Sequence, residues 1–281
     1  MDSKVVTMNN EHDDLVVVKD NNIINSSYRL TLVEQRIILG CISKIDSTKE
    51  FSDEDGFTIH VSEIEDLVTE GQLTSLYNQI KLGTNRLYER SIRLNDDDTD
   101  LVRWIYRRTY NDTEGSVTLY FTRNVLPYLT QLKGNFTKYK LQYVSKFKST
   151  HSIRIYELLV QWLSKGTREV EIDWLKKTLG VEDKYTRTNN FIERVVKRSI
   201  DDINTHSNIS VTFGTRKTGR RVTHVQFKFD VKEQNKKLKK GNKGTFKGID
   251  DKQVQEFCRN NVKLTQGKNL EEVKMMMLKR E

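Results

Sequence analysis

One order of predicted elements occurs twice along this chain, and that repeat restricts its fold more than any other feature. In each half, apolar residues spaced three and four apart predict a helix, a short helix and a long helix, and two predicted strands follow. The predicted elements cover residues 30–45, 61–68, 73–94, 101–110 and 116–123 in the first half, and 152–166, 171–180, 188–206, 209–214 and 222–230 in the second. Two halves with the same order of elements predict a duplicated module.

The two halves also share residues when they are aligned at an offset of 108 positions (171 − 63 = 108). The matching positions are Glu63-Ile64 with Glu171-Ile172, Leu67 with Leu175, Arg90-Ser91-Ile92 with Arg198-Ser199-Ile200, Val117 with Val225, and Phe121 with Phe229. A helix-turn-helix followed by a β-hairpin is the order of a winged helix. The sequence therefore predicts an α+β fold of two tandem winged-helix domains, residues 1–135 and 136–231, followed by a tail of residues 232–281.

Charge is distributed unevenly over these three segments. Residues 1–135 have 15 basic and 22 acidic side chains (net −7), residues 136–231 have 19 and 10 (net +9), and residues 232–281 have 14 and 7 (net +7). A basic excess beside a predicted helix-turn-helix indicates a nucleic-acid partner. We therefore expect the second domain to supply most of the sequence-specific DNA binding. The first domain is expected to make some backbone contacts, and the lysine-rich tail to be flexible.

The long helix predicted in the second half has the polar face that a major-groove helix needs. Asparagine can read adenine and arginine can read guanine, and a recognition helix presents such side chains opposite its apolar stripe. The candidate DNA-binding residues in and just before this helix are Lys184, Arg187, Asn189, Asn190, Arg194 and Lys197. The alternative is a solvated helix face with ion pairs such as Glu193 with Lys197. For Arg198, whose counterpart Arg90 recurs in the acidic half, a structural role is an equal expectation.

A second set of candidates lies at the tip of the second predicted hairpin. These candidates are Arg216, Lys217, Arg220 and Arg221. Four cations without a local carboxylate repel one another, so a bound polyanion would stabilise them. In the first half, possible DNA-backbone contacts are Lys81, Arg86, Arg107 and Arg108. The net charge of −7 makes a protein-facing surface an equally good interpretation of that half.

The sequence does not suggest catalysis, a metal site or a cofactor. None of the 5 histidines forms a His-x-His or His-x3-His pair, and Cys-x-x-Cys and His-Glu-x-x-His motifs are missing. Residues 214–221 have glycines at P-loop spacing, but arginines replace the required lysine and hydroxyl residue and the run lies in a hairpin. The acidic run at residues 96–100 is interpreted as a solvated turn. The sequence has no apolar run that could cross a membrane, and its two distant cysteines suit a reducing cytoplasm.

Three segments carry a resemblance to a known family: LTLVEQRIILGCI, SIRIYELLVQW, and FIERVVKRSIDDINTHSNISVTF followed by KTGRRVTHVQFKF. Over about residues 16–231 the chain resembles the Pi-like Rep initiator proteins of iteron-controlled, theta-replicating plasmids. The resemblance implies two winged-helix domains that bind repeated double-stranded DNA sites at an origin, open the duplex and recruit the host replication initiator and helicase. It also implies a monomer–dimer equilibrium, in which dimers joined through the first domain repress the protein's own gene, and a location on plasmid DNA in a bacterial-type cytoplasm.

Two other functions remain open from the sequence. A winged-helix transcriptional regulator would have the same fold and charge distribution but would not melt A·T-rich DNA beside its sites. A catalytic nickase would form a covalent tyrosine–DNA adduct, and the missing histidine pairs argue against it. Direct repeats of about two helical turns near the gene would favour the initiator, because two modules that read adjacent major grooves need roughly 20 bp.

Overall fold

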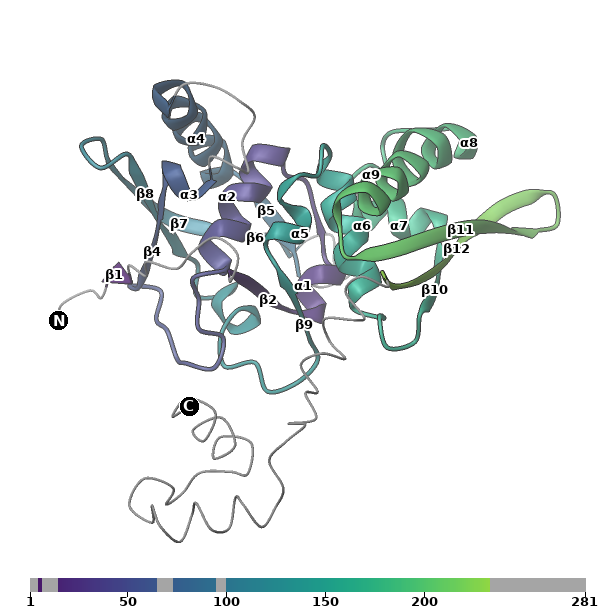
Figure 1. Ribbon diagram of the computed structural model, residues 1–281, viewed down its shortest axis with the longest axis horizontal. Helices are drawn as coiled ribbons and strands as arrows, with labels where there is room; N and C mark the ends of the chain where they lie inside the picture. The colour runs from purple at the N-terminus through teal and green to yellow at the C-terminus, as the bar shows by residue number, and fades with distance from the viewer. Residues whose placement is uncertain (1–4, 7–14, 65–72, 95–99, 233–281) are drawn as a thin grey trace, which may run out of the picture. The chain divides into compact units, whose positions relative to one another are not determined.

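The protein is represented by a computed structural model, which describes residues 5–6, 15–64, 73–94 and 100–232 (Figure 1). The predicted helix after residue 64, the acidic run at residues 96–99 and the tail after residue 232 lie outside the described residues. No helix in the described part is long and apolar enough to span a membrane.

The first half begins with strands and short helices and continues into a helix-turn-helix and a hairpin. Its elements are β1 (Val5–Val6), β2 (Val16–Asp20), α1 (Asn21–Asn25), β3 (Ser27–Tyr28), α2 (Leu32–Ile42), β4 (Gly56–His60), α3 (Val61–Ile64), α4 (Leu73–Tyr88), β5 (Ser91–Arg93), β6 (Val102–Arg103), β7 (Ile105–Asn111), β8 (Ser116–Phe121) and the 3-10 helix η3 (Leu126–Tyr128). The predicted helix over 73–94 ends early, because residues 91–93 pair as strand β5 with β3 and β6.

The second half has the same order in its helix-turn-helix and hairpin. Its elements are β9 (Phe136–Lys140), α5 (Gln142–Ser145), α6 (Thr150–Val160), β10 (Thr167–Glu171), α7 (Ile172–Thr178), α8 (Thr188–Phe191), the π-helical segment η4 (Ile192–Lys197), α9 (Arg198–His206), β11 (Ile209–Thr218) and β12 (Arg221–Val231). Together α8, η4 and α9 form one continuous helix over residues 188–206, as the apolar spacing predicts.

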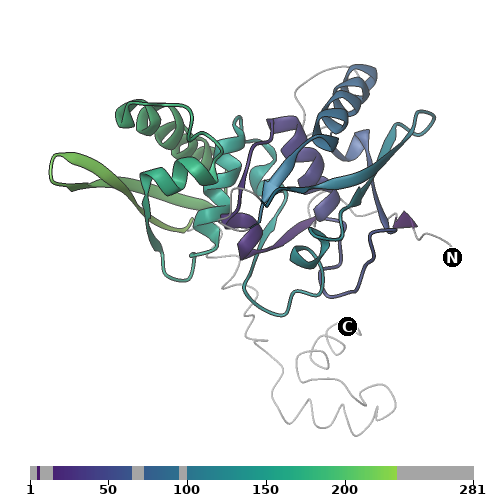
Figure 2. The same cartoon turned by 180° about the vertical axis from the view of Figure 1, so that it is seen from behind.

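Sheet topology confirms the duplicated winged helix. In the first half β8 lies between β4 and β7, and in the second half β12 lies between β10 and β11, with all of these neighbours antiparallel. Each half thus has a hairpin wing paired with a short strand that precedes the helix-turn-helix (Figure 2). The sequence prediction missed β4 and β10, because five-residue strands directly before a helix show too little alternation to stand out.

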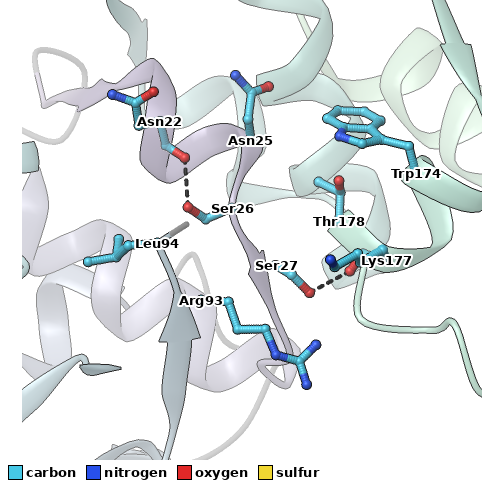
Figure 3. A pocket seen from close by; sticks show the side chains of 9 residues that line it. All are labelled: Asn22, Asn25, Ser26, Ser27, Arg93, Leu94, Trp174, Lys177 and Thr178. Atoms are coloured by element: carbon cyan, nitrogen blue, oxygen red, sulfur yellow. Dashed lines mark hydrogen bonds between the residues drawn. The ribbon is translucent and has the colours of Figure 1, made fainter. Parts of the chain in front are cut away.

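The two halves contact each other through many side chains. Strand β9 pairs with β2, so the segment after residue 135 joins a sheet with the start of the chain. Ser27 Oγ donates to the carbonyl oxygen of Lys177 at 2.5 Å, and Arg29 Nε donates to that of Gly180 at 2.7 Å. A polar pocket lies beside the Ser27–Lys177 hydrogen bond, and residues of α1, β3, β5 and α7 line it (Figure 3). Residues 1–231 form one compact unit, and the domain limit expected after residue 135 stays a prediction.

Candidate nucleic-acid interface

The helix over residues 188–206 presents a buried apolar face and an exposed polar face. Phe191, Val195, Val196, Ile200 and Ile203 are buried in the core. The exposed side chains on the other face are Asn189, Asn190, Glu193, Arg194, Lys197 and Arg198. Four of the six predicted helix and pre-helix candidates thus lie together on one solvent-facing surface, which we call the recognition face.

The recognition face includes the π-helical segment η4, Ile192–Lys197. A π-helical turn widens the helix and changes the direction in which its side chains point, and such turns occur frequently at functional sites. Glu193 and Lys197 form the ion pair expected from their spacing, at 3.3 Å between Oε2 and Nζ. Both side chains are more than half exposed, so the pair is weak and Lys197 can exchange it for a phosphate or a base edge.

Lys184 and Arg187 lie in the connection that leads into this helix. Both side chains are exposed, and Arg187 is the residue immediately before α8. The neighbouring Tyr185 has a positive φ of 57°, and its ring contacts that of Phe191 at the start of the helix. This contact fixes the turn, so the two cations lie at the N-terminal end of the recognition face, where a recognition helix approaches the bases most closely.

The wing of the second half, strands β11 and β12, is longer than the sequence prediction (Figure 1). The predicted loop over residues 215–221 is mostly strand, because Thr215–Thr218 continue the ladder and only Gly219 and Arg220 form the turn. Gly219 has φ of +62°, which a glycine adopts without strain. Lys217, Arg220 and Arg221 are exposed at this tip.

The expectation that all four wing cations lack a carboxylate partner was wrong for Arg216. Its Nη2 lies 2.7 Å from Oε1 of Glu169 on β10, and Gln226 Nε2 donates to the other carboxylate oxygen at 2.6 Å. Hydrogen bonds from Arg216 and Gln226 hold the pKa of Glu169 below its usual value. Among the described residues, none forms an ion pair with the other three wing cations, so the free positive charge of the wing comes from Lys217, Arg220 and Arg221.

In the first half, the four candidate cations all have contacts within the protein. Lys81 Nζ lies 2.6 Å from Oδ1 of Asp112 in the β7–β8 turn, and Arg86 Nε lies 3.5 Å from Oε1 of the buried Glu34. Arg107 lies 4.7 Å above the Tyr120 ring, and Arg108 lies over Tyr88 and donates to Asn85 at 3.0 Å. Three of these cations therefore have a carboxylate or amide oxygen as partner, and the partner of Arg107 within the described residues is the Tyr120 ring.

The alignment of Arg198 with Arg90 suggested a shared structural role, and the structure separates the two residues. Arg90 is two-thirds buried and bridges both carboxylate oxygens of Glu34, at 3.0 and 3.2 Å. Arg198 is exposed, and no described residue forms an ion pair with it. Arg198 is therefore a functional candidate that the sequence analysis left undecided, and its free guanidinium could be found only from the structure.

Within the described residues, no group of three or more histidine, cysteine or carboxylate side chains is arranged to hold a metal ion. Cys41 is fully buried, and burial raises the pKa of its thiol to about 12, so it stays protonated and unreactive at neutral pH. The described groups offer hydrogen-bond donors and positive charge for a polyanion.

Two family models match most of the two halves. "Initiator Replication protein, WH1" matches residues 16–160, and "Initiator Rep protein, WH2" matches residues 171–229. The chain belongs to this family of replication initiators. The resemblance drawn from the sequence and the two winged-helix domains are thereby confirmed.

Curated relatives of this initiator agree with the family models. A replication initiation protein of Escherichia coli is 27% identical over 234 residues, which cover 79% of this chain and 71% of that protein. The PI protein of Escherichia coli is 25% identical over 255 residues, with 76% of this chain and 82% of that protein covered. Among solved structures, the Pi initiator protein in complex with iteron DNA has the same fold, with a TM-score of 0.67, 24% identity, and coverage of 79% of this chain and 99% of that one.

Proposed function

We propose that this initiator binds repeated double-stranded DNA sites at a plasmid origin and promotes opening of the adjacent duplex. The observation that carries this proposal is the exposed recognition face together with three cations at the tip of the neighbouring wing that have no ion-pair partner in the described part of the chain. A helix face of asparagine, arginine and lysine can read base edges, and wing cations can follow the phosphate backbone. The solved complex of a Pi relative with iteron DNA supports the same class of partner.

We propose different roles in DNA binding and dimerisation for the two halves. The second half, with net charge +9, supplies most of the DNA affinity. In the first half Lys81, Arg86 and Arg108 are held by oxygen partners of the protein itself, so that half makes only a few backbone contacts and forms the dimer interface. Dimers would repress the protein's own gene, and host replication proteins would join at the opened origin, in a bacterial-type cytoplasm.

Duplex opening distinguishes the initiator from a plain regulator of the same fold. We expect the full chain, added to a supercoiled plasmid with direct repeats of roughly 20 bp, to make an adjacent A·T-rich segment reactive to permanganate. The control plasmid has scrambled repeats and the same A·T-rich segment. Binding to the repeats with an unreactive A·T-rich segment would identify a transcriptional regulator instead.

Asn190 is the best single test of base reading by the helix. Its side chain is exposed in the first turn of the helix and is uncharged, so its loss leaves the phosphate contacts intact. Asn190→Ala should cost about 1–3 kcal/mol at the cognate site and nothing on scrambled DNA, if the amide forms a bidentate contact with adenine. Competition binding with cognate and scrambled duplexes measures this. Equal weakening on the two duplexes would show that Asn190 does not read sequence.

A further inference from the structure

A buried carboxylate in the first half holds two arginines. Glu34 is fully buried at the third position of α2, and its carboxylate binds Arg86 of α4 and Arg90, two residues beyond the end of α4, with Nε–O distances of 3.5 and 3.0 Å. Glu34 Oε2 also accepts a hydrogen bond from the backbone of Thr31, the N-cap of α2, whose hydroxyl accepts one from Glu34 N. This reciprocal capping box therefore also anchors both arginines to the start of α2.

The second half keeps the two arginines and the cap and loses the carboxylate. At the offset of 108 residues, Arg86 and Arg90 correspond to Arg194 and Arg198 (86 + 108 = 194; 90 + 108 = 198). Helix α2 begins at residue 32 and its counterpart α6 begins at residue 150, an offset of 118 (150 − 32 = 118). The N-cap Thr31 therefore corresponds to the N-cap Ser149, and Glu34 corresponds to Ser152. In the second half a serine thus stands where the first half has the anion that both arginines bind.

A pocket lies beside Ser152, between the N-terminus of α6 and the helix over residues 188–206. Its volume is about 470 Å³, and Ser149, Ser152, Arg194 and Arg198 line it together with Lys148. Ser152 is fully buried, and its Oγ has no hydrogen-bond partner among the described residues. The pocket therefore offers two guanidinium groups and a free hydroxyl at the positive end of an eleven-residue helix.

We propose that this pocket binds one backbone phosphate of the DNA, which takes the place that the Glu34 carboxylate occupies in the first half. The proposal rests on the proposed function and deepens it: Arg194 and Arg198 lie on the recognition face itself, so a duplex docked there places its backbone at the pocket. Helix N-termini and paired arginines both favour a phosphate. Arg194, a base-reading candidate from sequence, is thereby assigned to the backbone.

The acidic residues of the pocket do not replace the missing anion. Asp202 accepts a hydrogen bond from the backbone of Lys148 at 2.8 Å, and Nε2 of His206 lies 3.8 Å from its other carboxylate oxygen. Asp201 is exposed. Neither carboxylate lies within ion-pair distance of Arg194 or Arg198 among the described contacts, so both arginines remain available to a phosphate.

The test restores the anion of the first half. Ser152→Glu should let the new carboxylate bind both arginines and exclude the phosphate, and Arg198→Gln should remove one donor. Each variant should bind cognate and scrambled duplexes at least about fivefold more weakly at 0.15 M salt and should lower the slope of log K against log[salt] by about 1. Lys165→Gln, in the turn that follows the C-terminal end of α6, lowers the net charge equally and should leave the slope unchanged.

Phosphate ethylation and inorganic phosphate identify the ligand. Ethylation of one particular phosphate of the duplex should lower the DNA affinity of the wild-type protein and leave the DNA affinity of Arg198→Gln unchanged. This result would support the proposal even if Ser152→Glu fails to fold. Variants that keep wild-type affinity and ethylation pattern would overturn it. A second outcome would also overturn it: inorganic phosphate stabilises the wild type, Ser152→Glu abolishes this stabilisation, and the DNA affinity of the variant stays at the wild-type value. The pocket would then bind a free anion and not a phosphate of the DNA. A wild-type chain that binds no duplex at all would instead refute the proposed function.

Discussion

Replacing Lys217, Arg220 and Arg221 together by alanine is expected to lower DNA affinity on the order of a hundredfold at 0.15 M salt. These are the wing cations without an ion-pair partner among the described residues, so each can neutralise one phosphate and release its counterions. Three lost contacts should lower the slope of log K against log[salt] by roughly 3. Cognate and scrambled duplexes should weaken by similar factors, because a wing tip follows the backbone and reads few bases. Binding titrations at several salt concentrations measure both effects.

Arg216→Ala is the matched control for this triple variant. Arg216 lies on the same wing, but it already shares the carboxylate of Glu169 with Gln226, so its removal should change the salt slope by less than 1. If Arg216→Ala weakens binding as much per charge as the triple variant, Arg216 exchanges its pairing with Glu169 for DNA. Arg216 would then contribute to binding like the other three wing cations. If the triple variant loses sequence preference while Asn190→Ala keeps it, the roles of wing and helix are reversed.

The features that the sequence predicted are those that recur or depend on local spacing. The apolar stripe of Val195, Val196, Ile200 and Ile203 fixes which face of the long helix is buried, so its exposed candidates follow from the same spacing. The duplicated order of elements fixes the winged helix, because few folds place a hairpin after a helix-turn-helix twice. Charge counted along the chain then points to the second half.

Contacts between distant segments could not be predicted in this way. Glu169 and Arg216 are 47 residues apart, and they meet because β10 and β11 flank β12 in the register of the sheet. The same limit applies to Ser152, an unremarkable serine in the sequence, whose correspondence with Glu34 appears only when both helices have their N-caps assigned. Sequence spacing identifies the face of an element, and pairing across elements decides which cations on it are free.

Glu157 is the centre of another such contact, in the core between the halves. Its carboxylate forms an ion pair with Lys19 of β2, lies 3.5 Å from Nη1 of Arg154, and accepts a hydrogen bond from the Tyr139 hydroxyl at 2.6 Å. All four side chains are at most 5% exposed. Burial, with a smaller contribution from the neighbouring Glu157, raises the pKa of Tyr139 well above its usual value, so the phenol remains the hydrogen-bond donor.

Glu157→Ala should destabilise the protein by about 3–5 kcal/mol, because it leaves the Lys19 ammonium buried without an anion. Urea denaturation measures the free energy of unfolding. The double variant Lys19→Met with Glu157→Leu should recover part of the loss, because it removes the unpaired Lys19 ammonium while Arg154 keeps its hydrogen bonds to Tyr28 Oη and the Ser26 carbonyl. The loss that remains reflects the Arg154 charge, which is still buried without its carboxylate. Glu193→Ala, which breaks only the exposed pair with Lys197, should cost less than about 1 kcal/mol.

The same variants separate the core from the DNA-binding surface. Glu157 lies away from solvent, so any loss of DNA binding in Glu157→Ala must come from a smaller folded fraction. The folded molecules should therefore keep the wild-type salt slope, whereas the triple wing variant should lower the slope and keep the wild-type free energy of unfolding. A loss of stability within about 1 kcal/mol for Glu157→Ala would contradict this account, because an ammonium left buried without an anion should cost more than that.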